Sequence, residues 1–249
     1  TYVNWASMRN DGFEVALTTR NINRNGFTWF TNFNLGYNQN KVLRETVPSN
    51  QTTPGREGYP VGALFAYKSA GLDDEGYPLF YNKEGEKVTA VELLKLNSAG
   101  ASTLSAEEQR NLYSYIGSSD PLFSGGFVNT FNIKRFEVVV NFIFNLKMYS
   151  RVAPSYTLTS FDRGMNTNRD ILNRWTPTNT NTDFPALLSD TKRTAEYSHY
   201  DIFSTYQMMD TWVKRSDHVR LQNIRVGYKL PETLMHTLGI RSATVALEG

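Results

Sequence analysis

The sequence predicts an all-β protein: antiparallel strands that form a portion of a transmembrane β-barrel, with long and partly helical loops between them. Three observations predict this fold. Two alternating runs of residues meet at Lys134-Arg135 and obey one register. The second run is long for a strand of a soluble protein, and the links between successive strands alternate between short and long.

The stretch from Gly125 to Tyr149 carries the clearest hairpin pattern. If Lys134 and Arg135 form a tight turn, apolar residues of the two arms lie opposite one another, and opposed residues of an antiparallel pair point to the same face. The expected opposed pairs are Ile133 with Phe136, Phe131 with Val138, and Phe127 with Phe142. The turn lacks an Asn-Gly or Asp-Gly pair, so its length is open by one residue.

This register gives the hairpin an apolar face and a mainly polar face. Asn129 is the one polar residue of the apolar set, which comprises Phe127, Phe131, Ile133, Phe136, Val138, Val140, Phe142, Phe144 and Leu146. Such a face needs a cover, either the second sheet of a soluble β-sandwich or membrane lipid. The length of the second arm, Phe136 to Tyr149, and the Asn, Glu and Lys residues of the opposite face favour the membrane barrel.

Further strands flank this hairpin. They are expected at residues 12–20, Phe27–Val42, His218–Leu230 and Ser242–Leu247. The first two form a second hairpin joined by the polar link Asn21–Gly26. The strand from His218 changes phase, which a β-bulge near Gln222-Asn223 would repair, and Pro231–Gly239 is expected to form a short helical turn before the last strand.

Two long segments, residues 43–124 and 150–217, separate the hairpins and are expected to be extracellular loops. In the first, turn signals at residues 74–76 and 83–85 predict a small hairpin within residues 70–88. The segments therefore have structure of their own and are not simple linkers.

Capping boxes predict where helices begin in these loops. Thr89-x-x-Glu92 and Ser105-x-x-Glu108 each fit the pattern, and the second helix is expected to continue to Tyr115 and to end at Gly117. In the second long segment, Thr167-x-x-Asp170 predicts a short helix that Pro177 ends.

The composition excludes several classes of protein. The formal net charge is +2, so no strongly basic field indicates a nucleic-acid partner. There is no cysteine, which excludes disulfides and thiolate metal sites. The three histidines lack HExxH spacing and there is no G-x-S-x-G motif; two acidic residues could pair as in a glycosidase, but no pair is singled out. We expect no cofactor, no metal site and no enzymatic activity.

Several motifs, in one order along the chain, resemble those of the SusC/RagA-like TonB-dependent outer-membrane transporters of Bacteroidetes. They begin with the NDGFE sequence at residues 10–14 and GLDDEGYP at residues 71–78. They continue with YIGSSDP at 115–121, RWTPTN at 174–179, and VRLQNI running to GYKLP between residues 219 and 231. Each motif is weak alone, and their order over nearly the whole chain makes the resemblance specific.

The resemblance implies that residues 1–249 are the C-terminal part of a 22-stranded barrel, of which this chain holds about six strands. The plug, the TonB-contacting N-terminal region and the last strand would lie outside it. Such transporters import oligosaccharides or peptides across the outer membrane of Gram-negative bacteria, together with a SusD-like surface lipoprotein and the TonB complex. The chain begins without Met and ends within an apolar alternation, so we expect a portion of a longer protein. The cargo, glycan or peptide, is not determined by the composition.

Aromatic and acidic residues of the loops are candidates for ligand binding. They are Tyr67, Asp73, Tyr81, Trp175 and Tyr206. Trp175 could stack on a sugar ring, although such a residue more often anchors its own loop, and for Tyr67 and Tyr81 a place in the loop core is favoured over contact with a ligand. Asp73 belongs to an acidic run that could bind calcium or form a solvated turn, and its spacing does not fit an EF-hand.

A second group of residues is expected to face the barrel lumen, where it would contact the plug or line the permeation path. The group comprises Glu14, Arg20, Asn32, Asn34, Asn141 and Asn145. Two other functions stay open at this point: a secreted, soluble carbohydrate-binding β-sandwich, and a β-rich glycoside hydrolase. Solubility without detergent would separate the transporter from both.

Overall fold

A computed structural model describes residues 6–152, 166, 168–187, 202–237 and 239–249. The chain divides into two compact units, which are described separately. The sheet unit comprises residues 9–40, 121–148 and 216–249, and the loop unit comprises residues 1–8, 41–120 and 149–215.

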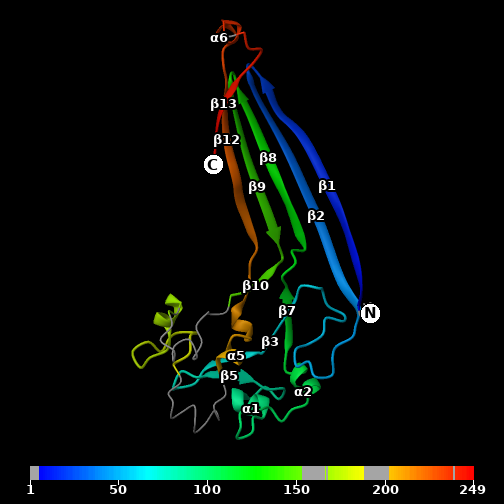
Figure 1. The fold of residues 1–249 in the computed structure, drawn as a ribbon, viewed down its shortest axis with the longest axis vertical. Coiled ribbons are helices and arrows are strands. Elements are labelled where there is room, and N and C mark those ends of the chain that lie inside the picture. The colour runs from blue at the N-terminus through cyan, green and yellow to red at the C-terminus, as the bar shows by residue number, and fades with distance from the viewer. Residues whose placement is uncertain (1–5, 153–165, 167, 188–201, 238) are drawn as a thin grey trace. The chain divides into compact units, whose positions relative to one another are not determined.

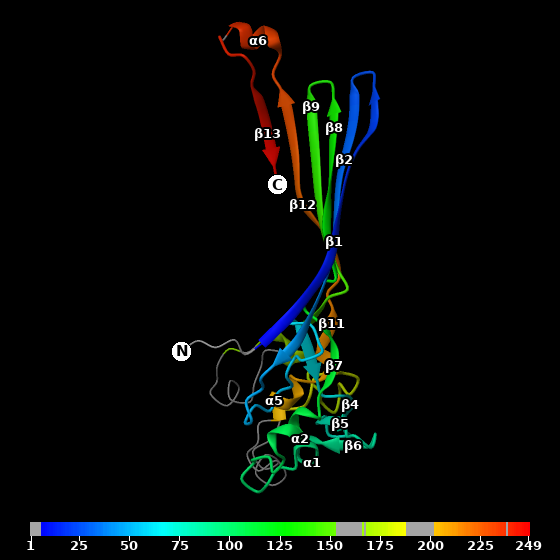
Figure 2. The ribbon, with the colours of Figure 1, turned by 90° about the vertical axis from the view of Figure 1, so that its right-hand side faces the viewer.

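The sheet unit is a six-stranded antiparallel meander: its strands lie side by side in the order in which they occur along the chain (Figures 1 and 2). The strands are β1 (Ala6–Arg24), β2 (Phe27–Glu45), β8 (Phe123–Ile133), β9 (Phe136–Leu146), β12 (His218–Lys229) and β13 (Thr244–Glu248). The first residues of β1 and the last of β2 extend into the loop unit. The all-β prediction is confirmed, and no helix among the described residues is long and apolar enough to cross a membrane.

The register predicted for the central hairpin is confirmed. Strands β8 and β9 pair with Ile133 opposite Phe136, Phe131 opposite Val138 and Phe127 opposite Phe142. The two-residue turn is Lys134-Arg135, and Lys134 adopts a φ of 55° in the left-handed region, which a two-residue hairpin turn requires. The predicted length of the turn is therefore correct.

Several strand boundaries differ from the prediction, and two of the differences change the links between strands. The polar link expected at Asn21–Gly26 is much shorter, because β1 continues to Arg24 and only Asn25-Gly26 turns, with φ values of 49° and 77°. These angles are those of the Asn-Gly hairpin turn. The second arm of the central hairpin was expected to reach Tyr149, but β9 ends at Leu146 and Lys147 takes a φ of 55°. The chain then enters β10 (Tyr149–Arg151), which pairs with β11 (Val213–Arg215) in a separate sheet of the loop unit.

The C-terminal part follows the prediction closely. The pairing of β12 with β9 shifts by one residue between Leu221 and Asn223, which is the predicted bulge. Helix α6 (Glu232–Thr237) lies where a helical turn was expected, and β13 is the predicted sixth strand.

The loop unit contains short strands and helices. Its other strands are β3 (Ala63–Ala66), β4 (Ser69–Leu72), β5 (Pro78–Tyr81), β6 (Lys87–Thr89) and β7 (Ser114–Ser118). Strands β4, β5 and β6 form a three-stranded meander at the predicted small hairpin, whereas β3 pairs with β7. The helices are α1 (Ala90–Leu94), α2 (Ala106–Arg110), η1 (Arg169–Asn173), α5 (Ile202–Tyr206) and η2 (Asp210–Trp212).

Both predicted capping boxes are present, at the start of α1 and of α2. The predicted extent of the second helix is wrong, because α2 ends at Arg110 and Tyr115 pairs with Phe65 in the β3–β7 sheet. Thr167 lies outside the described residues, and the described cap of η1 is Asn168, whose side chain accepts a hydrogen bond from the backbone of Asp170.

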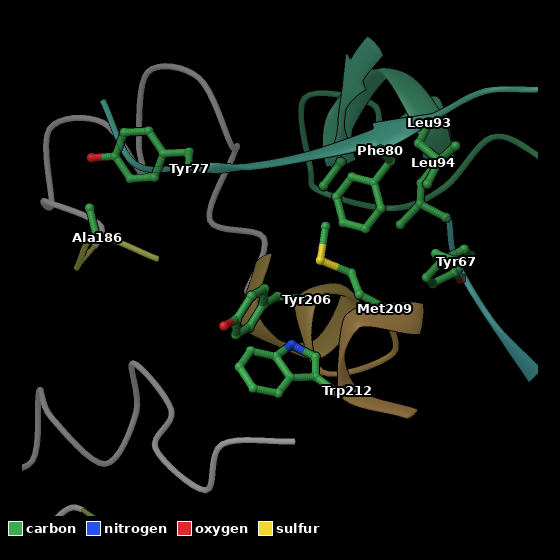
Figure 3. Close-up of a cluster of buried hydrophobic side chains, with 10 residues drawn as sticks. Tyr67, Tyr77, Phe80, Leu93, Leu94, Ala186, Tyr206, Met209 and Trp212 are labelled. Atoms are coloured by element: carbon green, nitrogen blue, oxygen red, sulfur yellow. The ribbon is translucent and has the colours of Figure 1, made fainter. Parts of the chain in front are cut away.

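The loop unit has its own hydrophobic core. It is built from Tyr67, Tyr77, Phe80, Ala90, Leu93, Leu94, Ala186, Tyr206, Met209 and Trp212. Met209 points toward the ring of Phe80, and Tyr206 lies against Trp212 (Figure 3). The side chains of Phe80, Met209 and Tyr206 are 0–1% exposed, so this unit is folded around a dry centre rather than being a floppy linker.

Candidate functional site

One face of the six-stranded sheet is apolar across all of its strands. The cross-strand rows run, for example, through Tyr228, Phe136, Ile133 and Phe27, and through Leu221, Phe142, Phe127 and Phe33. Rings stack across strands at Phe127–Phe142, Phe33–Phe144 and Trp29–Phe131, with centroids 4.8–6.2 Å apart. Yet many of these side chains stay open to the surroundings: Phe13 is 55% exposed, Leu221 46% and Val245 61%. A continuous, exposed apolar surface of this kind marks contact with another protein or with a membrane.

The apolar face contains one small polar cluster. Asn129, the polar exception in the sequence pattern, accepts hydrogen bonds through Oδ1 from Trp29 Nε1 at 2.9 Å and from Thr31 Oγ1 at 2.7 Å. Asn21 Nδ2 in turn donates to Thr31 Oγ1 at 2.7 Å, and Thr19 donates to Asn21. The cluster spans β1, β2 and β8, and it pairs polar groups that would otherwise face an apolar medium.

The opposite face is mainly polar, and it carries the residues that the sequence predicts to face a lumen. Asn32 accepts a hydrogen bond from Thr18 on the neighbouring strand, at 2.9 Å. The guanidinium of Arg20 lies 5.5 Å from the ring centroid of Phe30. Asn145 lies 3.4 Å from the ring of His218. The register therefore brings these predicted residues to one face of one sheet.

One ion pair crosses the polar face. Arg225 on β12 donates to Glu137 on β9 at 2.6 Å. Both side chains are about one third exposed, so the pair contributes little to the stability of the fold. The Arg225 guanidinium lies near Gly227: a Cβ added to this glycine would be 3.7 Å from Nη1 of Arg225.

A groove lies on this polar face over β1, β2, β8 and β9. It consists of two adjoining hollows of about 300 Å³ and about 570 Å³, which share Ala16, Asn34 and Gly125. Small residues, namely Ala16, Gly36, Ser124 and Gly126, and apolar ones such as Val128 and Ile143 line it together with Glu14, Asn32, Asn34 and Asn141. We call it the asparagine groove. It gathers four of the six residues predicted to face the lumen.

The loop residues predicted to bind ligand do not form one site. Tyr67 is 6% exposed and Tyr206 1% exposed, and both belong to the hydrophobic core of the loop unit. The Tyr206 hydroxyl donates to the backbone oxygen of Asp183 at 2.8 Å. The Tyr81 ring lies 5.3 Å from the Lys68 ammonium. The two core tyrosines thus have little surface left for a ligand.

Asp73 and Trp175 both serve the turn that precedes β5. The Asp73 carboxylate accepts hydrogen bonds from the backbone of Glu75 and of Tyr77, at 2.9 and 2.8 Å, which closes the acidic turn. The Trp175 ring lies on Gly76, whose φ is 83°, and packs against the core. The described residues contain no group of three or more histidine or acidic side chains that could hold a metal ion.

The sequence reasoning missed an exposed aromatic cluster in the loop unit. Tyr59, Phe65 and Tyr115 lie with ring centroids 4.8–5.9 Å apart, and Tyr59 and Tyr115 are 38–39% exposed. Partial burial, together with the neighbouring phenols of Tyr149 and Tyr59, raises the pKa of Tyr115 above its ordinary value of 10.0. The cluster depends on the long-range pairing of β3 with β7, so no local sequence pattern predicts it.

Comparison with known proteins gives relatives over almost the whole chain, although no family model matches. TonB-dependent receptor P3 of Formosa agariphila is 28% identical over 262 residues, which covers 99% of this chain and 24% of that protein. TonB-dependent receptors P26 and P39 of the same organism are 26% and 24% identical over 99% and 95% of this chain. This chain spans about a quarter of the length of these curated relatives.

Solved structures share the fold. The structure of the RagAB peptide transporter matches 98% of this chain and 25% of its own, with a TM-score of 0.66 and 22% identity. The RagAB peptide importer in the open-open state gives the same TM-score at 21% identity. The resemblance to SusC/RagA-like TonB-dependent transporters is confirmed by the two sets of relatives.

Proposed function

We propose that this chain is part of the barrel wall of a TonB-dependent transporter, in the outer membrane of a Gram-negative bacterium. The transporter would import oligosaccharides or peptides. The observation that carries the proposal is the exposed apolar face of the six-stranded sheet, backed by a polar face in a single register. Relatives named as TonB-dependent receptors support the same function and a role that is not enzymatic.

The height of the apolar face fits a membrane. Along β2 it reaches from Phe27 to Tyr37, the residues opposite Ile133 and Phe123. Ten residues at about 3.3 Å each extend about 33 Å, and a strand tilt of about 40° reduces this to about 25 Å across the bilayer. The apolar band of outer-membrane barrels is about 25 Å tall. Aromatic rings at both ends of the face, such as Phe136 and Tyr37, suit the two interfaces.

The links between strands suit one orientation in the membrane. The turns at Asn25-Gly26 and Lys134-Arg135 have two residues each, and α6 lies in the third short link. Outer-membrane barrels have short periplasmic turns and long extracellular loops. The loop unit would then face the cell exterior, where we expect a SusD-like lipoprotein and cargo, while the TonB complex acts through the protein's plug region.

The two faces of β9 provide the test. Val140→Arg, made in the full-length protein, would put a charge on the lipid face near mid-membrane, which costs about 2–4 kcal/mol. Asn141→Arg changes the adjacent residue on the polar face and serves as the matched control. We expect Val140→Arg to abolish the heat-modifiable folded band in outer-membrane fractions, and Asn141→Arg to keep it. Equal assembly of the two variants would contradict the proposal.

A further inference from the structure

The loop unit contains a pocket of about 220 Å³. It is lined by residues 82–84 of the β5–β6 turn, by Val88 and the end of α1, and by Leu104, Glu108 and Leu112 around α2; we call it the lysine pocket. Pockets for drug-sized ligands have about 300–1,000 Å³. The lysine pocket is smaller than that, so it fits one small molecule rather than an oligosaccharide or a peptide.

The wall of the lysine pocket is aliphatic. It is formed by Val88, Leu93, Leu104 and Leu112. Leu93 belongs to the hydrophobic core of the loop unit, and Val88 and Leu112 pack against that core, so the wall is fixed by a folded interior. The described residues that line the pocket include no aromatic ring on which the apolar side of a sugar would stack. The wall therefore favours a ligand with an aliphatic group.

Three of the polar side chains that line the pocket already serve the local fold. The Glu92 carboxylate accepts hydrogen bonds from the backbone and the hydroxyl of Thr89, at 2.8 and 3.1 Å. The Glu108 carboxylate accepts the same two bonds from Ser105, both at 2.8 Å. The Asn82 side chain closes the β5–β6 turn. These three groups are held in place by their own caps and turn.

The other three charged groups of the lining are unused. Within the part of the chain that the structure describes, the side chains of Lys83, Lys95 and Glu84 make neither a hydrogen bond nor an ion pair. Hydrogen bonds from Ser105 lower the pKa of the Glu108 carboxyl, and the charges of Lys95 and Lys83 lower it further, so both ammonium groups lie on the Glu108 side of the pocket. Two free cations and one free anion match a ligand that carries both a carboxylate and an ammonium group.

We propose that the lysine pocket binds a free aliphatic α-amino acid, such as leucine, as the zwitterion. Lys83 and Lys95 hold the carboxylate, Glu84 holds the ammonium group, and the side chain lies against the aliphatic wall. The lining as a whole has two lysines and three glutamates, so it does not attract a simple anion. A simple cation would leave both lysines without an acceptor. The inference goes beyond the proposed function, because it concerns the loop unit alone and does not depend on what covers the sheet.

The test is calorimetric titration of the purified full-length protein in detergent with L-leucine. Two analogues each lack one charge: isocaproate has no ammonium group, and isopentylamine has no carboxylate. Leucine should bind about tenfold more tightly than either, because each analogue loses a charge-assisted hydrogen bond. Glycine, which lacks the aliphatic group, and trileucine, which is too large for the pocket, should both bind more weakly than leucine.

Substitutions at exposed residues assign the binding to this pocket. Lys95→Gln and Glu84→Gln should each weaken leucine binding about fivefold, as expected for a partly exposed charged partner. Lys87→Gln and Glu107→Gln are the matched controls, since both residues are exposed in the same unit and neither lines the pocket. Three results would each overturn the proposal: no heat of binding with leucine, an analogue with one charge that binds as tightly as leucine, or a control substitution that weakens binding as much as its partner in the pocket.

Discussion

Trp29 and Asn129 are joined by a hydrogen bond across β2 and β8, 2.9 Å from the indole nitrogen to the carboxamide oxygen. The same oxygen accepts from Thr31 at 2.7 Å. The pair lies on the apolar face, where water would not replace a missing partner if lipid covers that face. Asn129 thus satisfies two donors at once, and its presence in an apolar row has a structural reason.

We expect Asn129→Leu to destabilise the proposed barrel even though it makes the face more apolar. The substitution leaves the donors of Trp29 and Thr31 without their acceptor, and an unsatisfied buried group costs about 1–3 kcal/mol. The melting temperature of the heat-modifiable band should fall. The double variant Trp29→Phe/Asn129→Leu removes one orphaned donor and should recover part of the loss. A barrel stabilised by Asn129→Leu alone would contradict this account.

Gly76 is expected to be intolerant of a methyl group for two reasons. Its φ of 83° is strained for any other residue, and the added Cβ would lie 2.5 Å from the Trp175 ring. Gly76→Ala should therefore speed proteolysis of the loop unit in the purified protein, with an extra cost of about 1–3 kcal/mol for overpacking. Gly85→Ala is the control, because Gly85 has a φ of 84° with open space around it. Equal effects of the two substitutions would show that the Trp175 contact contributes nothing.

The capping box of α1 supports the core of the loop unit, because this helix positions Leu93 and Leu94. Thr89 Oγ1 accepts from the backbone N–H of Glu92, and the Glu92 carboxylate accepts from the backbone N–H of Thr89. Thr89→Ala should cost about 1 kcal/mol and accelerate amide hydrogen exchange in α1 about fivefold. Thr89→Ser keeps the oxygen and should exchange almost as the unsubstituted protein does. Similar exchange in Thr89→Ser and Thr89→Ala would be inconsistent with the cap.

The Tyr115 phenol should lose its proton at a higher pH than an ordinary tyrosine does. Burial favours the neutral phenol and raises its pKa above 10.0. The folded state therefore binds the proton more tightly than the unfolded state. The resulting stability is present below pH 10 and is lost as the pH rises through the raised pKa. The difference titration between the unsubstituted protein and Tyr115→Phe, followed by tyrosinate absorbance, should show this step above pH 10.

Tyr59→Phe provides the control for Tyr115. It removes a neighbouring phenol that contributes to the raised pKa, so Tyr115 should ionise at a lower pH. A step for Tyr115 at or below its ordinary value would show that the ring is not desolvated in the folded protein.

The sheet could be predicted because its signals are local or reinforce each other. Both arms of the central hairpin alternate around one turn, which fixes the pairing of Phe131 with Val138. The phase change in β12 is visible in the sequence itself, and the bulge lies where Leu221 and Asn223 require it. The first turn was misjudged because Asn21 and Arg24, which suggest a loop, belong to the strand.

The loop unit was less predictable because its contacts join distant parts of the chain. The helix after Ser105 ends at Arg110 and does not reach Tyr115. Tyr115 belongs to strand β7, where it pairs with Phe65, which lies far earlier in the sequence. Tyr67 and Tyr206 looked like candidate ligand residues, and their burial follows from a core assembled from both long segments. The groove was foreseeable only as a set of polar residues on one face, because its hollow depends on the glycines beside them.

The bulge in β12 has a consequence for how the six-stranded sheet tolerates changes in the length of this strand. Gln222 is the extra residue at the point where the register with β9 shifts, and Leu221 and Ile224 fall on the same side because of it. Deleting Gln222 would bring those two residues into the spacing of an ordinary strand, so every side chain before and after the gap would keep its orientation. A homologue one residue shorter at this position would thus keep the same two faces of the sheet, without the bulge.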